Sequence, residues 1–156
     1  MDQRTTLGAR PDEHADIRLW LRLLFCAGNI ESRLQSRIND RFGISLARFD
    51  LLAQLERSSD GLTMTELSRR MVVSNGATTS LVDRLEEDGL LKRLPHPADR
   101  RATIIRLTAR GRARFLSVAK EHEVWVTELL GPLDTDVKTM LQAGLGILKR
   151  HLEACP

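Results

Sequence analysis

The chain has 156 residues, of which 42% are hydrophobic and 29% are charged, a composition typical of one globular domain and not of a disordered chain. Its 24 lysine and arginine residues outnumber its 21 aspartate and glutamate residues only slightly, so the net charge is weak evidence for a nucleic-acid partner. No apolar run is long enough to span a bilayer, and Cys26 and Cys155 lie far apart, which argues against a zinc ribbon. We therefore expect a cytoplasmic protein that needs no metal or other cofactor.

The N-terminal part is predicted to contain an arm followed by two helices. Residues 1–12 are polar and lack helical periodicity, so we expect a flexible arm there. A long helix is predicted over about residues 13–41, ending at Gly43, with apolar residues on more than one face. Such a helix in a small domain is often buried against a partner chain. Ser45 is a suitable N-cap for a second helix, which ends near residue 58.

Residues 63–89 have the pattern of two short helices joined by a turn. Thr63 and Glu66 have the spacing of a capping box for the first helix, and Ser74 is predicted to cap the second, which ends at Gly89. The residues predicted to share the apolar face of the second helix are Ala77, Thr78, Leu81, Val82 and Leu85. The small or polar residues on its opposite face are Gly76, Thr79, Ser80 and Asp83. This combination is typical of a helix-turn-helix, because short polar side chains can reach base edges in the major groove.

Positive charge is concentrated in the segment that follows this helix. Residues 92–114 contain eight lysines and arginines and one acid, Asp99. Residues 90–94 and 102–107 are predicted to form two short strands around a turn at residues 95–100. A helix-turn-helix followed by a basic hairpin is a winged helix, whose tip contacts the DNA backbone and minor groove. We interpret Asp99 as holding a neighbouring arginine in position.

Two further helices are predicted at the C-terminal end. Thr108 is suited to cap a long helix, Gly131 ends it, and a last helix begins near Asp134. Both have apolar stripes, and His122 lies in the first of these as an expected core or interface residue. Because the stripes exceed what a small winged domain covers, we predict a dimer.

The expected fold is mainly α with a small β-hairpin wing. It contains a winged helix-turn-helix at about residues 45–108 and dimerisation helices at about residues 13–41 and 109–152, in a single domain of residues 13–156.

Four motifs occur in a fixed order: LVDRL at residues 81–85, GL at 89–90, DRR at 99–101 and LT at 107–108. In this order they resemble the MarR family of winged-helix transcriptional regulators, over about residues 15–152. The resemblance implies a homodimer that binds a pseudo-palindromic promoter site, acts as a repressor, and is released by a small, often aromatic, effector. With the helix pattern, it gives these candidate DNA-binding residues: Thr63, Ser74, Asn75, Thr79, Ser80, Arg84, Asp99, Arg100 and Arg101.

An effector pocket is predicted between the first two helices. Its candidate residues are Trp20, Arg22, Leu24, Arg48 and Phe49. Aromatic side chains suit an aromatic ligand, and the arginines would neutralise its carboxylate or phosphate. In the absence of a ligand, Trp20 and Phe25 are expected to pack in the core.

Several alternatives follow from the same residues. One branch of the MarR family senses peroxides through a first-helix cysteine assisted by tyrosines; this chain has Cys26 but no tyrosine, which favours packing of Cys26 over redox sensing. A non-specific architectural DNA-binding protein would have the same winged helix without base preference. A winged helix used only for protein contacts does not explain the basic wing. An enzyme is not expected, since the GxSxG, P-loop, GxGxxG and HExxH motifs are absent.

Overall fold

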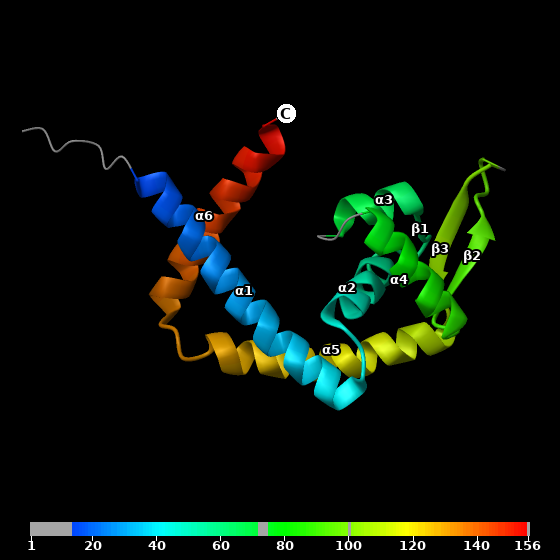
Figure 1. Cartoon of the computed structure of the whole chain (residues 1–156), viewed down its shortest axis with the longest axis horizontal. Helices are drawn as coiled ribbons and strands as arrows, with labels where there is room; N and C mark the ends of the chain where they lie inside the picture. Colours follow the sequence, from blue (N-terminus) through cyan, green and yellow to red (C-terminus); the bar gives the residue numbers. More distant parts are fainter. Residues whose placement is uncertain (1–13, 72–74, 100, 156) are drawn as a thin grey trace, which may run out of the picture.

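The computed structural model describes residues 14–71, 75–99 and 101–155, which form helices and three short strands (Figure 1). In chain order these are α1 (Ala15–Phe42), α2 (Leu46–Glu56), β1 (Leu62–Thr63), α3 (Met64–Arg70), α4 (Asn75–Glu87), β2 (Leu91–Pro95), β3 (Thr103–Leu107), α5 (Ala109–Leu130) and α6 (Thr135–Ala154). The winged helix, α2 to β3, lies at one end and α5 runs from it toward the end formed by α6 and the first half of α1. None of the described helices is long and apolar enough to cross a membrane.

Local signals in the sequence set most of the helix boundaries. The hydroxyls of Ser45, Thr63 and Thr108 each accept a hydrogen bond from a backbone N–H three residues later and so begin α2, α3 and α5. Gly43 ends α1 with a φ of 64°, a left-handed conformation that glycine adopts without a steric penalty. These predicted boundaries are confirmed, whereas the predicted cap Ser74 lies outside the described residues.

The three strands form one antiparallel sheet in the order β1-β3-β2. The predicted hairpin is confirmed: β2 and β3 pair from Leu91 opposite Leu107 to Pro95 opposite Thr103. Strand β1, in which Leu62 pairs with Ile105 of β3, was not predicted from the sequence. A strand of two residues has no periodicity of its own, so only its partner across the sheet defines it.

One apolar core holds the winged helix together. Its buried members are Leu51, Leu52, Leu55, Leu62, Leu67, Met71, Val82, Leu85, Leu90, Leu91 and Ile105. In α4, the fully buried side chains are those of Thr78, Val82 and Leu85, as the predicted apolar face requires. Ala77 was expected on the same face but is exposed, because it lies in the first turn and burial begins only at Thr78.

A second apolar cluster, here named the junction cluster, joins α1, α2 and α5. Its buried members are Ile38, Ile44, Phe49 and Val118, and partly buried aromatic side chains from α1 and α5 pack against them. Phe115 of α5 contacts both this cluster and the core of the winged helix. The winged helix is therefore packed without interruption onto α5 and the second half of α1.

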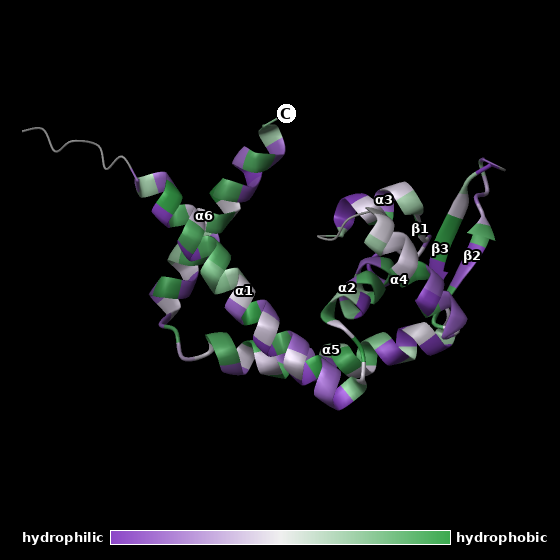
Figure 2. Cartoon of the chain, in the orientation of Figure 1, coloured by the Kyte–Doolittle hydropathy of each residue, from purple (hydrophilic) through white to green (hydrophobic). Residues whose placement is uncertain are grey.

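The first half of α1 and most of α6 carry apolar side chains that the single chain does not cover (Figure 2). The large ones are Ile17, Leu19, Trp20, Leu21, Leu24 and Phe25 on α1, and Met140, Leu141, Leu145, Ile147 and Leu152 on α6. The packing expected for Trp20, Phe25 and Cys26 is therefore wrong within one chain, since all three are exposed. The first half of α1 extends away from the junction cluster, so the fold of one chain leaves these side chains in water.

Candidate DNA-binding surface

Helix α4 presents a small, polar face to solvent. Gly76, Thr79, Ser80 and Asp83 are exposed as the helical pattern predicted, and Arg84 beside them is exposed as well. The opposite face of α4 is anchored in the core of the winged helix, so the orientation of the polar face is fixed. A helix that contacts base edges in a major groove needs short polar side chains and a fixed orientation, and this face of α4 has both. Asn75 is the first residue of α4, and its side chain lies outside what the structure describes.

Thr63, a candidate DNA contact, has a defined role inside the chain. Its hydroxyl accepts a hydrogen bond from the backbone N–H of Glu66, and its own backbone N–H donates to the Glu66 carboxylate at 2.8 Å. The backbone hydrogen bond from Thr63, followed by the hydrogen bond from its hydroxyl, lowers the pKa of Glu66. Thr63 thus sets the start of α3, whatever further contact it makes with DNA.

The tip of the wing is a turn closed by local hydrogen bonds. Asp99 Oδ1 accepts a hydrogen bond from the backbone N–H of Arg101 at 2.9 Å, and His96 Nδ1 accepts one from the N–H of Ala98 at 3.1 Å. Asp99 therefore holds Arg101 through the main chain and shapes the turn, where the sequence had led us to expect it to hold an arginine side chain. Arg101 is exposed at the tip, and Arg100 lies outside the described residues.

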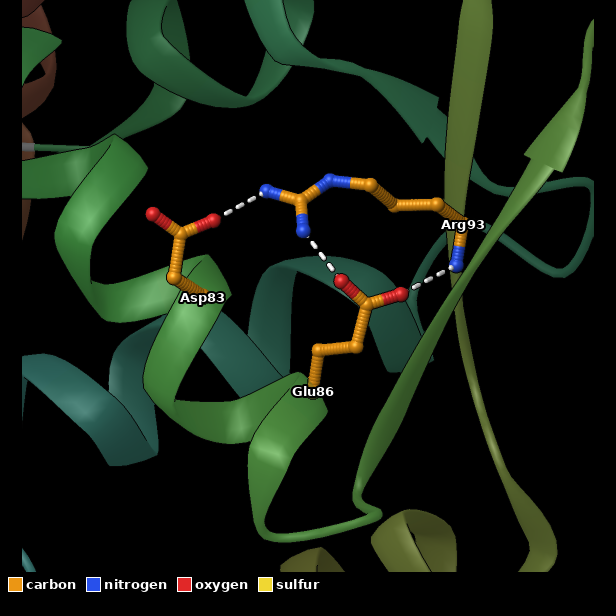
Figure 3. A network of polar contacts seen from close by, with 3 residues as sticks. All are labelled: Asp83, Glu86 and Arg93. Atoms are coloured by element: carbon orange, nitrogen blue, oxygen red, sulfur yellow. Dashed lines mark hydrogen bonds and ion pairs between the residues drawn. The ribbon is translucent and has the colours of Figure 1, made fainter.

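The guanidinium of Arg93 in β2 joins the wing to α4 (Figure 3). It lies between two carboxylates of the helix, donating to Asp83 Oδ1 at 2.6 Å and to Glu86 Oε2. The backbone N–H of Arg93 also donates to Glu86 Oε1 at 3.0 Å. These contacts, the hydrogen bond to Asp83 first among them, raise the pKa of Arg93. Sequence reasoning missed this network, since no local pattern pairs a strand residue with a particular helix turn.

Other arginines of the basic segment also have partners within the chain. Arg106 donates to the Asp60 carbonyl at 2.8 Å, and Arg112 forms an ion pair with Glu56 at 2.8 Å. Lys92, Arg101 and Arg110 are exposed. The predicted basic patch thus contains arginines with partners within the chain, of which Arg112 is itself exposed, and further exposed cations.

The five candidate effector residues lie in two places. Trp20, Arg22 and Leu24 are exposed on the first half of α1. Phe49 is buried in the junction cluster, and Arg48 forms an ion pair with Asp88, just after α4, at 2.8 Å. Figure 1 shows α2 beside α5, away from the first half of α1. Within one chain, the structure does not bring the two groups together.

A groove of about 610 Å³ lies between α1 and α5. Arg37 crosses it, donating to Glu128 Oε2 at 2.6 Å with its guanidinium 5.9 Å from the centre of the Trp125 ring. Arg33 and Pro132 also line it. This volume falls in the range of small-molecule sites, and no pattern in the sequence had indicated it. No three His, Cys, Asp or Glu side chains of the described segments converge in a way that could hold a metal ion.

Comparisons with known proteins support this interpretation of the geometry. The family model "MarR family" matches residues 42–102. The HTH-type transcriptional regulator PecS of Dickeya dadantii (strain 3937) is 31% identical over 145 residues, which cover 92% of this chain and 87% of that protein. The chain belongs to the MarR family.

Solved structures of MarR family proteins have the same fold. The MarR family transcriptional regulator from Silicibacter pomeroyi is 33% identical, with a TM-score of 0.77 over 91% of this chain and 99% of that chain. A mutant of MarR from E. coli complexed with operator DNA is 27% identical, with a TM-score of 0.75 over 88% of this chain and 99% of that chain. This MarR family chain is therefore a winged-helix, DNA-binding transcriptional regulator, a class of protein distinct from enzymes.

Proposed function

We propose that this MarR family chain acts as a homodimeric repressor of a pseudo-palindromic promoter site, and that a small aromatic effector releases it. The observation that carries the proposal is the pairing of an anchored polar face on α4 with an exposed Arg101 at the wing tip. The helix supplies groups for base recognition and the wing supplies a cation for the phosphate backbone or minor groove. The polar face of α4 and the wing belong to the same packed winged helix, so their relative orientation is fixed, as sequence-specific binding requires.

The uncovered apolar side chains of α1 and α6 support a homodimer. Leu21 and Phe25 of α1 and Leu141 and Leu145 of α6 are exposed in the single chain. Exposed apolar side chains in such number mark an interaction site, and two-fold symmetric pairing of identical chains is the commonest way to cover them. We expect Leu145→Glu to give a monomer in sedimentation velocity, whereas Leu116→Glu, an exposed position on α5, should leave the dimer intact.

Dimerisation gives the DNA site its form. Two α4 helices related by a two-fold axis would contact half-sites about 10 base pairs apart in successive major grooves. An effector that changes the angle between the two chains changes the spacing of these helices and lowers the affinity without touching DNA. A coupling of about 1–3 kcal/mol would give roughly 5- to 150-fold release.

Two positions are available for the effector, and the two tryptophans of the chain distinguish them. One is the predicted site around Trp20, completed by a second chain; the other is the groove beside Trp125. We propose an aromatic carboxylate as the ligand, since each position combines an indole ring with arginine. Titration of the single-tryptophan variants Trp20→Phe and Trp125→Phe with salicylate or benzoate, followed by fluorescence, would show which ring the ligand perturbs.

Selection from a random duplex library tests the proposed function directly. The purified protein is incubated with the library at a salt concentration that suppresses non-specific binding. We expect enrichment of a two-fold symmetric sequence with half-sites one helical turn apart. Strongly salt-dependent binding without enrichment would instead support an architectural DNA-binding protein.

Redox sensing through Cys26 remains a second candidate because its thiol is exposed on α1. It predicts that peroxide lowers the DNA affinity of the parent protein and leaves Cys26→Ser unaffected. Equal behaviour of the two proteins would exclude it.

A further inference from the structure

An acid on the DNA-facing side of α4 needs neutralisation if this helix is to approach DNA. Asp83 is exposed on the same face as Thr79 and Ser80. A carboxylate in that place repels phosphates within a Debye length of about 8–10 Å. Glu86 follows it by three residues, so the two carboxylates are neighbours on the helix surface.

Arg93 neutralises both acids from the adjoining strand. Its guanidinium donates to Asp83 Oδ1 at 2.6 Å through one nitrogen and to Glu86 Oε2 through the other. The Arg93 side chain is 31% exposed, so solvent screens these contacts less than it screens a fully exposed pair. Figure 3 shows the guanidinium lying across the gap between the strand and the helix.

Because of its position in the sheet, Arg93 also fixes the wing relative to α4. Arg93 lies in the middle of β2, opposite Ile105 of β3. Ile105 is fully buried in the core, and the two strands continue from there to the wing tip. The backbone N–H of Arg93 is also hydrogen-bonded to Glu86. Side chain and main chain together therefore fix the strands of the wing at one angle to α4.

We propose that Arg93 is a positioning residue for base recognition, which holds α4 and the wing in one orientation by binding Asp83 and Glu86 and does not itself contact DNA. The inference rests on the proposed sequence-specific binding and adds a specificity determinant outside the DNA-contacting residues. The positive charge of its guanidinium is already balanced by two carboxylates, so Arg93 would attract a phosphate less strongly than an unpaired arginine would.

Two variants of opposite charge separate positioning from electrostatics. Arg93→Gln removes one positive charge, whereas the double variant Asp83→Asn, Glu86→Gln removes two negative charges; both break the same link. Neutralisation of the acids predicts opposite changes in overall affinity, with weaker DNA binding for the first and tighter binding for the second. Positioning predicts, in addition, the same loss of base preference in both.

The measurement is the affinity for the selected site and for single base-pair substitutions of it, at several salt concentrations. In the parent protein a substituted base pair is expected to cost roughly 5- to 150-fold in affinity. We expect this factor to fall below about threefold in both variants, at the positions contacted by α4. The salt slope of Arg93→Gln should remain within about half a unit of the parent, since no phosphate contact is lost.

Clear results would overturn the inference. Undiminished base preference in either folded variant contradicts a positioning role, and a salt slope lowered by about 0.9 in Arg93→Gln assigns Arg93 to a phosphate contact. Arg41→Gln is the matched control, because it removes one arginine from an exposed ion pair with Glu121 far from α4. If thermal unfolding shows that Arg93→Gln does not fold, the double variant decides alone. Failure of the parent protein to select any sequence would contradict the proposed function itself, which is a separate outcome.

Discussion

Phe49 of α2 stacks on Phe115 of α5, with their ring centroids 5.6 Å apart and their planes 14° from parallel. Phe49 is buried and belongs to the junction cluster, while Phe115 contacts both that cluster and the core of the winged helix. The stack therefore joins the winged helix to α5, the helix that runs toward the end with the uncovered apolar surface. A rotation of α5 against the winged helix cannot occur without changing this contact.

Truncation of this stack should destabilise the whole chain. Phe49→Ala removes a buried ring, so we expect a loss of about 3–5 kcal/mol in the free energy of unfolding, measured by urea denaturation. Leu116→Ala, an exposed position one residue after Phe115, should change it by less than about 1 kcal/mol. Equal effects of the two variants would mean that the junction cluster contributes little to stability.

A close approach between α5 and the start of β2 provides a second stability test. A Cβ added at Gly111 would lie 2.0 Å from the Leu90 carbonyl oxygen, closer than van der Waals contact permits. Gly111→Ala should therefore force the helix away from the strand and cost about 1–3 kcal/mol or more by thermal or urea unfolding. Gly76→Ala is the matched control, since a Cβ added there would meet nothing within 4 Å and only a change within about 1 kcal/mol is expected. A tolerated Gly111→Ala would disprove the tight packing.

The elements that sequence reasoning predicted are those with local causes. Ser45, Thr63 and Thr108 act within one helical turn, so their capping roles were visible in the sequence and are confirmed. The hairpin and the polar face of α4 followed from periodicity and are also confirmed. By contrast, the hydrogen bond between Arg93 of β2 and Asp83 of α4 joins two different elements. No local pattern in the sequence predicts which strand residue meets which helix residue.

The apolar side chains of α1 illustrate a different limit of sequence reasoning. Trp20 and Phe25 were expected in a core, because large apolar residues are usually buried. They are exposed in the single chain, since α1 extends beyond the elements that could cover them. The pattern predicts that this helix is buried, but it does not specify whether the same chain or another chain supplies the covering surface.

His122 should make stability depend on pH. Its ring lies 4.9 Å from the Phe49 ring, and partial burial lowers its pKa from the ordinary value of 6.5. Because the folded pKa lies below the unfolded value, the unfolded chain binds more protons between the two, and stability falls as the pH falls through this window. The contribution of neutral His122 to the free energy of unfolding is thus fully present above about pH 6.5, and it is lost once the pH falls below the lowered pKa of the folded state.

The variant His122→Leu removes this titration and keeps an apolar side chain in place. We expect the difference in unfolding free energy between His122→Leu and the parent to grow as the pH falls from about 7 to 5, measured by urea denaturation. Parallel profiles of the two proteins would show that His122 titrates alike in the folded and unfolded states.

Arg101 at the wing tip should contribute affinity without sequence preference. Its side chain is exposed and its backbone N–H is held by Asp99, so the wing tip presents a cation to solvent. Arg101→Ala should weaken binding to every duplex and lower the salt slope of log K by about 0.9, the value for one phosphate contact. An unchanged slope, measured by fluorescence anisotropy at several salt concentrations, would remove the wing tip from the DNA contact.

Thr79 and Ser80 should behave in the opposite way, because short hydroxyl side chains on α4 suit base edges. Both side chains are exposed. Thr79→Ala or Ser80→Ala should relax the preference at a few positions of each half-site, by about 1–3 kcal/mol per base pair, and leave the salt slope unchanged. Repeated selection from the random library with each variant measures this directly. Uniform weakening at all positions would instead place these hydroxyls against the phosphate backbone, and base recognition would have to come from elsewhere on the surface.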